Sequence, residues 1–214
     1  TNVFVDGYTG MEDNMLLGRS GHTGANFGGY DRLYVGATGF GGVVAPGRGI
    51  MRWDLSSMHG QYRSILALTL RFHSKNATSS GMWVYAVKPA NSAWEPGTNE
   101  GATQSGKSCW DYRAYNTTDW AGTNGCGEAG VDFDAESLAY MTWGTSSTGT
   151  IDIALNATHD ELTALVDTWA GNQADNAGLF MRARDGDESE GQFDGIEFRS
   201  SDYSTMAERR ELII

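Results

Sequence analysis

The sequence predicts an all-β fold, specifically a jelly-roll β-sandwich of two antiparallel sheets with one short capping α-helix at about 158–170. Two observations support this prediction. Several runs alternate apolar and polar residues between turn residues, and glycine is abundant while proline is scarce, at 29 and 3 of 214 residues. No linker, change of composition or internal repeat divides the chain, so residues 1–214 are expected to form a single domain.

The predicted strands are short runs in which every second side chain is apolar. In the run 48–55, Met51, Trp53 and Leu55 are expected to face the core. In the run 65–73, every second residue from Leu66 to Phe72 is expected to do so. Residues 3–5 and 212–214 are expected to form terminal strands that pair with each other. The internal runs are 48–55, 65–73, 82–87, 149–155, 178–184 and 195–200.

The one predicted helix begins at a capping box. Thr158 and Glu161 stand three positions apart, where the hydroxyl and the carboxylate satisfy each other's backbone amides. One apolar stripe follows, and Gly171 is suited to end the helix. The stripe consists of Leu162, Leu165, Val166 and Trp169. The helix is expected to cover an open end of the sandwich.

The charge balance narrows the classes of partner. Acidic residues outnumber basic ones 27 to 15, which gives a net charge of −12. Nucleic-acid binding is disfavoured because it needs a basic surface. Membrane insertion is not expected, because no apolar run approaches the roughly 20 residues of a membrane span. Neutral partners or cations are favoured.

Cys109 and Cys126 lie in a stretch that is rich in Gly, Asn and Thr. Two buried thiols are one interpretation, but the loop-rich setting favours a disulfide, which would stabilise the fold by about 3 kcal/mol. A disulfide persists outside the cytoplasm. The chain begins at Thr1 without a leader, so it is expected to be a processed or excised part of a larger protein that is secreted or displayed at the cell surface.

Several segments, in a fixed order along the chain, carry a resemblance to a known family. They are 26–36 (NFGGYDRLYVG), 49–56 (GIMRWDLS), 64–71 (SILALTLR), 94–95 (WE), 165–169 (LVDTW), 176–179 (NAGL) and 198–202 (FRSSD). Together they resemble the DNRLRE domain, a module related to the disaggregatase repeat and treated as a carbohydrate-binding module family. The resemblance implies a jelly-roll sandwich attached to secreted polysaccharide-degrading enzymes or cell-surface proteins, and some members bind alginate or other glycans.

The first candidate ligand-binding region is the aromatic stretch within residues 93–140. Flat aromatic rings on an ordered loop stack on the apolar C–H faces of sugars while polar neighbours bind the hydroxyl groups. The alternative is that these rings pack beneath the loop as its own core. The candidate residues are Trp110, Tyr112, Arg113, Tyr115 and Trp120.

The second candidate region is the solvent side of one sheet. Side chains two positions apart share a face, so one interpretation is a row of cations that lines a groove suited to uronate or sulfated glycans, although ordinary salt bridges are the favoured interpretation. These salt bridges would be with neighbours such as Asp54 and Glu197. The candidate residues are Arg52, Arg71, His73, Arg182 and Arg184.

A structural calcium ion is the only cofactor that the sequence suggests. Asn26 and Asp31 lie in a glycine-rich loop, and Asp194 follows a crowded acidic turn; such oxygens are the ligands that calcium prefers. The preceding turn, with Asp185, Asp187, Glu188 and Glu190, is interpreted as a solvated acidic hairpin. The four histidines lack zinc-ligand spacing, and no organic cofactor is expected.

These features predict a non-catalytic carbohydrate-binding module that anchors a secreted enzyme or cell-surface protein to a neutral or uronate-containing polysaccharide. One alternative is a structural or adhesive module of a cell-surface protein. Another is a polysaccharide-degrading enzyme, a glycosidase or lyase, with its carboxylates among Glu95, Glu100, Asp132 and Asp134. The motifs of serine hydrolases, phosphate loops and zinc proteases are missing from the sequence.

Overall fold

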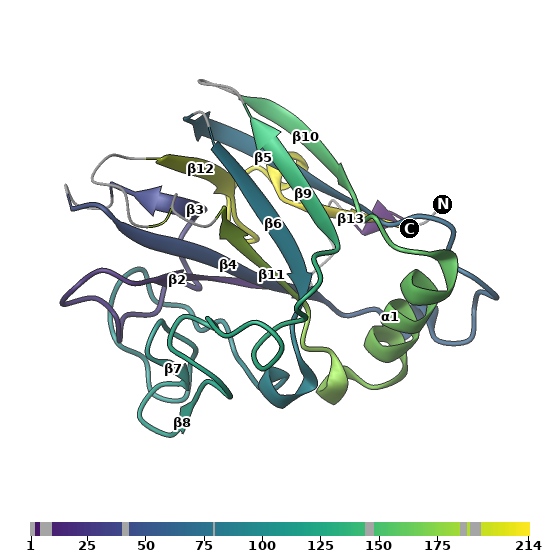
Figure 1. The fold of residues 1–214 in the computed structure, drawn as a ribbon, viewed down its shortest axis with the longest axis horizontal. Helices are drawn as coiled ribbons and strands as arrows, with labels where there is room; N and C mark the ends of the chain where they lie inside the picture. The colour runs from purple at the N-terminus through teal and green to yellow at the C-terminus, as the bar shows by residue number, and fades with distance from the viewer. Residues whose placement is uncertain are drawn as a thin grey trace.

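The computed structural model describes residues 3–4, 10–39, 43–78, 80–143, 148–184, 188 and 194–214, and it confirms the all-β class (Figure 1). Eleven strands form one large sheet that curls on itself, and every strand pairing within it is antiparallel. The sequence predicted a sandwich of two separate sheets. In the described residues the two halves are joined, because β3 pairs with β4.

The curled sheet has two halves whose inner faces pack against each other. The first half contains, in spatial order, β2 (Met11–Leu17), β4 (Ala45–Trp53), β11 (Leu179–Ala183), β6 (Ser80–Ala86) and β9 (Ala139–Trp143). The second half contains β3 (Arg32–Thr38), β12 (Asp194–Arg199), β5 (Thr69–Ala77), β10 (Gly149–Ala154), β13 (Glu211–Ile213) and β1 (Val3–Phe4).

The main core lies between the two halves and follows the period-2 alternation of the strands. Met51 and Trp53 of β4 are almost completely buried in it, as are Leu70 and Phe72 of β5. The ring of Phe72 lies 4.6 Å from that of Phe198 on β12, measured between centroids. Burying each such large side chain contributes about 1.5–3 kcal/mol, so this core supplies most of the driving force for folding.

The six predicted internal runs correspond to β4, β5, β6, β10, β11 and β12, with shifted ends. The predicted terminal pairing is confirmed for the described residues, since Val3 pairs with Ile213 and Phe4 with Leu212. The prediction for Leu66 was wrong: β5 begins only at Thr69, and Leu66 is 67% exposed. Strands β2, β3 and β9 were not predicted.

The helix prediction is confirmed. Helix α1 spans His159–Gly171, and its capping box joins Thr158 and Glu161 in both directions. The Thr158 amide donates to Glu161 Oε2 (2.7 Å), and the Glu161 amide donates to Thr158 Oγ1 (3.3 Å). On its buried side, Val166 and Trp169 join the main core, so α1 closes one end of the sandwich as expected.

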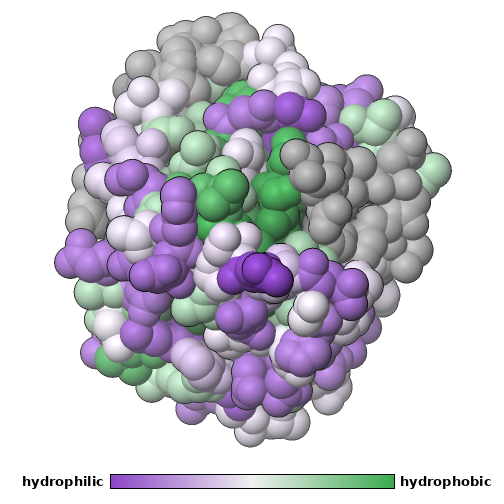
Figure 2. All heavy atoms as spheres, turned by 90° about the vertical axis from the view of Figure 1, so that its right-hand side faces the viewer, coloured by the Kyte–Doolittle hydropathy of each residue, from purple (hydrophilic) through white to green (hydrophobic). Residues whose placement is uncertain are grey.

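The side of the molecule that carries α1 is not uniformly polar. Viewed from this side, the surface shows an apolar area with polar residues above and below it (Figure 2). Beside α1 lies the connection between β4 and β5, which includes the exposed Leu66. The cover that α1 and this connection provide is therefore partial, and apolar side chains remain in contact with solvent.

A buried ion pair ties the C-terminal segment to the first half of the sheet. Arg210 Nη2 lies 2.5 Å from Asp13 Oδ2, and both residues are at most 3% exposed. Asp13 Oδ2 also accepts a hydrogen bond from the Ser201 amide (2.7 Å). Burial lowers the pKa of Arg210, an effect that Asp13 opposes; burial and the Asp13 charge raise the pKa of nearby Asp202.

Replacing Asp13 with Ala is expected to lower the free energy of unfolding by about 3–5 kcal/mol, because the buried Arg210 guanidinium loses its counter-charge. Urea unfolding followed by circular dichroism measures this change. The double variant Asp13→Leu with Arg210→Met is expected to recover much of the loss, because no buried charge then remains unpaired.

The control is Glu208→Ala, which removes a surface ion pair with Arg199 (3.4 Å). That change is expected to cost less than about 1 kcal/mol. If Asp13→Ala lowers the free energy of unfolding no more than Glu208→Ala does, the buried Asp13–Arg210 pair does not stabilise the fold as expected.

Candidate functional site

The outer face of the first half is divided into a covered part and an open part. In the covered part, Leu16, Ile50 and Phe180 point away from the main core but are fully buried. Residues 88–137, which we call the covering segment, pack on them and include the small hairpin of β7 (Tyr112–Ala114) and β8 (Thr118–Asp119). This second core explains why a long, largely irregular stretch is ordered.

Aromatic side chains of the covering segment provide most of the contact in the second core. Trp94, Trp120 and Phe133 pack there, and the Phe133 ring stacks on that of Phe180 with 4.9 Å between centroids. The Trp94 indole N–H donates to the Ala177 carbonyl (2.9 Å), which satisfies its one polar group. These aromatic residues therefore serve packing and are not available to a ligand.

Buried amides anchor the covering segment to the sheet. Asn14, on the outer face of β2, donates through Nδ2 to both the carbonyl and the hydroxyl oxygen of Ser108 (2.8 Å each). Asn26 Nδ2 donates to the same carbonyl (2.9 Å) and to that of Pro96. Because these groups are buried, each lost bond would leave an unsatisfied polar atom at a cost of about 1–3 kcal/mol.

Asp132 organises the far end of the covering segment. Its carboxylate is fully buried and accepts four hydrogen bonds of 2.9 Å, from the amides of Gly122, Thr123 and Glu128 and from Asn91 Nδ2. Both oxygens are engaged, so Asp132 holds a loop in shape. This role is structural and differs from the glycosidase carboxylate considered from the sequence.

The open part of the outer face carries an aromatic pair beside cations. Strand register places Tyr140 of β9 opposite Trp83 of β6, and Trp83 opposite Arg182 of β11. The two rings lie 4.1 Å apart between centroids at an interplanar angle of 36°, and Tyr140 is 39% exposed. Gly81 makes room for this pair, since a Cβ there would lie 2.5 Å from the Tyr140 hydroxyl.

Arg48 marks the border between the open and covered parts. Its Nε and Nη2 donate to the Glu188 carboxylate (3.1 and 2.7 Å), and its Nη1 donates to the Gly125 carbonyl (2.9 Å). The guanidinium also stacks on Trp110, with Cζ 4.6 Å from the ring centroid. Arg182 Nη2 lies 3.6 Å from Glu188, so one carboxylate is shared by two guanidinium groups.

The aromatic candidates of the covering segment differ in how deeply they are buried. Trp120 is buried, only 4% exposed, and its indole donates to the Cys109 carbonyl (3.0 Å), so its predicted role in stacking on a sugar was wrong. Trp110 lies partly buried against Arg48. Tyr112 and Tyr115 remain partly exposed and contact each other edge to face, with 5.6 Å between centroids.

Arg113, the cation predicted beside these rings, donates through Nη1 to the Ala90 carbonyl. Its guanidinium is thus used to hold two parts of the covering segment together. Only the two tyrosines of this candidate set keep partly exposed rings without a packing role in the second core.

The predicted single basic groove was wrong. Arg71 and His73 lie on β5 in the second half of the sheet, whereas Arg52 lies on β4 and Arg182 on β11 in the first half. Arg184 follows the end of β11, is exposed, and belongs to the same part of the molecule as Arg182. The curled sheet therefore separates these cations into two groups on different faces.

Two of these cations are held by neighbouring acids. Arg52 Nε lies 2.6 Å from Glu12, and its guanidinium stacks on Trp94 with Cζ 4.7 Å from the ring centroid. Arg71 binds Asp152 at 2.7 and 2.8 Å and lies 3.2 Å from Glu211. The Arg71 bonds lower the pKa of Asp152. The salt-bridge interpretation is correct for both arginines.

The predicted calcium ligands do not come together. Asn26 is buried and uses its amide oxygen to accept bonds from the Gly28 and Asn99 amides (3.2 Å each). Asp31 and Asp194 lie at opposite ends of the β3–β12 ladder. In the described part of the chain, no group of three potential ligands forms a metal site.

Of the acidic turn that precedes Asp194, the structure describes only Glu188 among the four acidic residues considered from the sequence. Asp185, Asp187 and Glu190 lie outside the described residues, and Glu188 is buried beside Arg48. Bound calcium stays a prediction from the sequence, with no site assigned to it.

The predicted disulfide is not present in the structure. Cys109 and Cys126 are both free and buried. Cys126 packs in the second core and its Sγ lies 3.9 Å from the Asp132 carbonyl, so it behaves as a small apolar residue. Burial raises the pKa of Cys109 to about 11 and that of Cys126 well above its ordinary value, which keeps both thiols protonated.

Sequence reasoning missed Trp83, Tyr140 and Gly81. The run 82–87 was recognised as a strand, and its alternation places Trp83 on the face opposite Met82 and Val84. Tyr140 becomes its neighbour only through the pairing of β6 with β9, which no local pattern reveals.

Comparison of the chain with known proteins gives no match to any protein-family model or to any curated protein. Within the described residues, no helix combines the length and apolar character needed to span a membrane.

The free thiols predict a specific chemical behaviour. With Ellman's reagent at neutral pH, the folded protein is expected to react very slowly, because both sulfurs are buried and protonated. In concentrated guanidinium chloride without reductant, two thiols per chain are expected to react. A count of zero thiols in the denatured, unreduced protein would instead establish the disulfide.

Proposed function

We propose that this protein is a non-catalytic carbohydrate-binding module that binds a polysaccharide through the open face, defined as Trp83, Tyr140, Arg182 and Arg184. The single observation that carries the proposal is the Trp83–Tyr140 contact, on a part of the sheet where the described residues leave Tyr140 39% exposed. Trp83 is partly exposed and Tyr140 is 39% exposed, and stacked aromatic rings that keep contact with solvent are suited to binding a ligand.

The chemistry of the open face suits a sugar chain. The C–H face of a pyranose ring is apolar and stacks on indole and phenol rings, whereas its hydroxyl groups need polar partners. Arg182 lies across from Trp83 in the strand register, so a guanidinium group that also contacts Glu188 lies in the same row. An exposed strand surface, unlike a closed pocket, accommodates the interior of a long polymer.

The resemblance to the DNRLRE domain supports the same proposal independently of the geometry. Since no family model matches the chain, the resemblance rests on the ordered sequence segments alone. On this proposal the domain belongs to a larger secreted or cell-surface protein, which it anchors to a neutral or uronate-containing polysaccharide.

A structural or adhesive module is the second candidate function. The observation that favours it is the engagement of so many expected ligand-binding groups within the protein: Trp120 is buried, and Arg52 and Arg71 are paired with acids. A degrading enzyme has less support, because Asp132 is fully engaged in loop contacts and Glu95 and Asp134 pair with Lys107 and Lys88.

Affinity electrophoresis through gels that contain neutral or uronate-rich polysaccharides tests the proposal. Tyr140→Ala and Trp83→Phe are expected to weaken binding, the former roughly tenfold, because one stacked ring contributes about 1–1.5 kcal/mol. The matched control is Tyr112→Ala, which removes a partly exposed tyrosine of the covering segment and is expected to leave the affinity unchanged.

Wild-type protein that is not retarded by any polysaccharide would overturn the proposal in favour of a structural module. If Tyr112→Ala weakens binding and Tyr140→Ala does not, the polysaccharide binds the covering segment instead. Unfolding curves for each variant verify that the substitutions preserve the fold.

Salt separates the contributions of the rings and the cations. Binding of a uronate-rich polysaccharide is expected to weaken severalfold as ionic strength rises from about 10 mM to 150 mM, because the screening length falls from about 30 to 8 Å. Binding of a neutral polysaccharide is expected to change little. Equal salt dependence for both polymers would exclude Arg182 and Arg184 from a direct role.

A further inference from the structure

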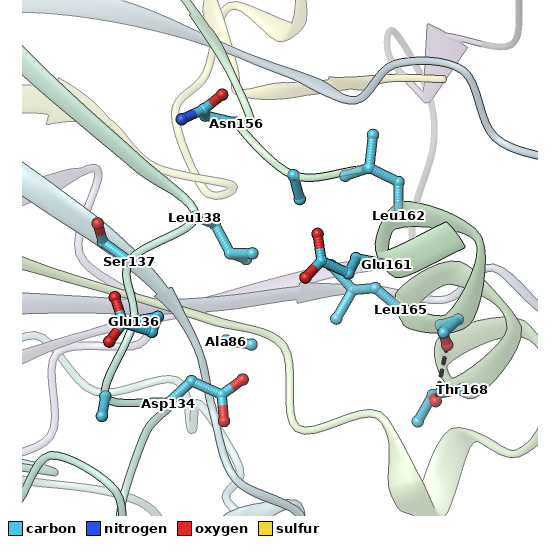
Figure 3. Close-up of a pocket in the computed structure, with 13 residues that line it drawn as sticks. Ala86, Asp134, Glu136, Ser137, Leu138, Asn156, Glu161, Leu162, Leu165 and Thr168 are labelled. Atoms are coloured by element: carbon cyan, nitrogen blue, oxygen red, sulfur yellow. Dashed lines mark hydrogen bonds between the residues drawn. The ribbon is translucent and has the colours of Figure 1, made fainter. Parts of the chain in front are cut away.

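A cavity of about 680 Å³ lies between α1 and the segment 134–138 (Figure 3), and neither Trp83 nor Tyr140 lines it. Its floor is aliphatic and includes Leu138, Leu162 and Leu165, with Ala86 from the end of β6. The volume is within the roughly 300–1,000 Å³ that small-molecule sites occupy. No aromatic ring lines it, so it differs in chemistry from the proposed sugar-binding surface.

Carboxylates stand on both sides of this aliphatic floor. Asp134 and Glu136 come from the segment 134–138, and Glu161 comes from α1. Figure 3 shows the Asp134 and Glu161 carboxylates pointing from these two sides toward the space between them. The lining residues include no Lys, Arg or His. An anion is therefore disfavoured here, and the net charge of −12 draws cations to the protein.

One of these carboxylates already binds an ammonium group. Lys88 Nζ pairs with Asp134 at the edge of the cavity, and the Lys88 side chain is partly exposed. A ligand ammonium would make the same kind of contact and would compete with Lys88 for it. The chain itself thus provides an example of the head group that this position accepts.

Glu161 is held ionised at the opposite side. It accepts bonds from the Thr158 amide (2.7 Å) and hydroxyl (2.8 Å), and within the described residues both bonds use Oε2. These bonds lower the pKa of Glu161, so it remains an anion at neutral pH. Its Oε1 remains available to a ligand.

We propose that this cavity binds a linear aliphatic diamine or polyamine. The methylene chain lies on Leu138, Leu162 and Leu165, one ammonium group pairs with Glu161, and the other pairs with Asp134 or Glu136. The cavity has an apolar floor with a carboxylate on each side, which matches a ligand that carries a positive charge at each end of a hydrocarbon chain. Neither a neutral lipid nor a single-headed amine would use both sides.

Isothermal titration calorimetry at low salt, with 1,5-diaminopentane and spermidine as probes, tests the proposal. Pentane-1,5-diol has the same length without charge and is expected not to bind. Pentylamine has one charge and is expected to bind roughly tenfold more weakly than the diamine, which corresponds to the loss of one ion pair of about 1.4 kcal/mol.

Variants of the chain provide matched controls. Glu161→Gln removes the charge and keeps the capping bond, since Gln also serves in a capping box, and it is expected to weaken diamine binding roughly tenfold. Asp160→Asn removes an equal charge from the same helical turn outside the cavity and is expected to have little effect. Glu136→Gln alters an exposed side chain and is expected to weaken binding severalfold.

Lys88→Gln is the decisive variant, because it is expected to increase affinity. Removing the internal ammonium frees Asp134, so the diamine should bind severalfold more tightly, a result that damage to the fold does not produce. The proposal is overturned if the diol binds as well as the diamine, if Glu161→Gln and Asp160→Asn have equal effects, or if no heat is measured at millimolar probe.

Discussion

Leu16, Ile50 and Phe180 face away from the main core and are nevertheless fully buried, because the covering segment packs on them. A central sheet with apolar residues on both faces cannot leave either face in water. Among the described residues the cover stops short of Trp83, which is partly buried, and of Tyr140, which is 39% exposed. The extent of the cover therefore determines where this face of the sheet meets solvent.

Polar contacts keep the cover in place at its borders. Asp132 binds the loop amides at one end, Asn14 holds Ser108 on the sheet, and Arg48 connects Glu188, Gly125 and Trp110 at the edge of the open face. Buried charges and amides are stable only when they are fully paired, so these contacts specify one position for the covering segment. The two cysteines add apolar packing without a covalent link.

Local patterns in the sequence were sufficient for the fold class, for α1 and for most of the strands. Alternation correctly assigned Met51 and Trp53 to the core, and the capping box located Thr158 as the start of the helix. Alternation could not show what lies against the other face of a strand, so the second core around Ile50 was not predicted. The open face was missed because Trp83 and Tyr140 meet only through strand pairing.

The outer face leaves Tyr140 exposed and Trp83 partly exposed, whereas Trp94 and Trp120 are buried beneath the covering segment. Hydroxyl-radical footprinting read by mass spectrometry, with and without a retained polysaccharide, measures this directly. Trp83 and Tyr140 are expected to oxidise readily and to become protected when the polysaccharide is added, while Trp94 and Trp120 are expected to oxidise slowly in both cases. Protection of Trp83 in the free protein, or oxidation of Trp120 at a comparable rate, would contradict this arrangement.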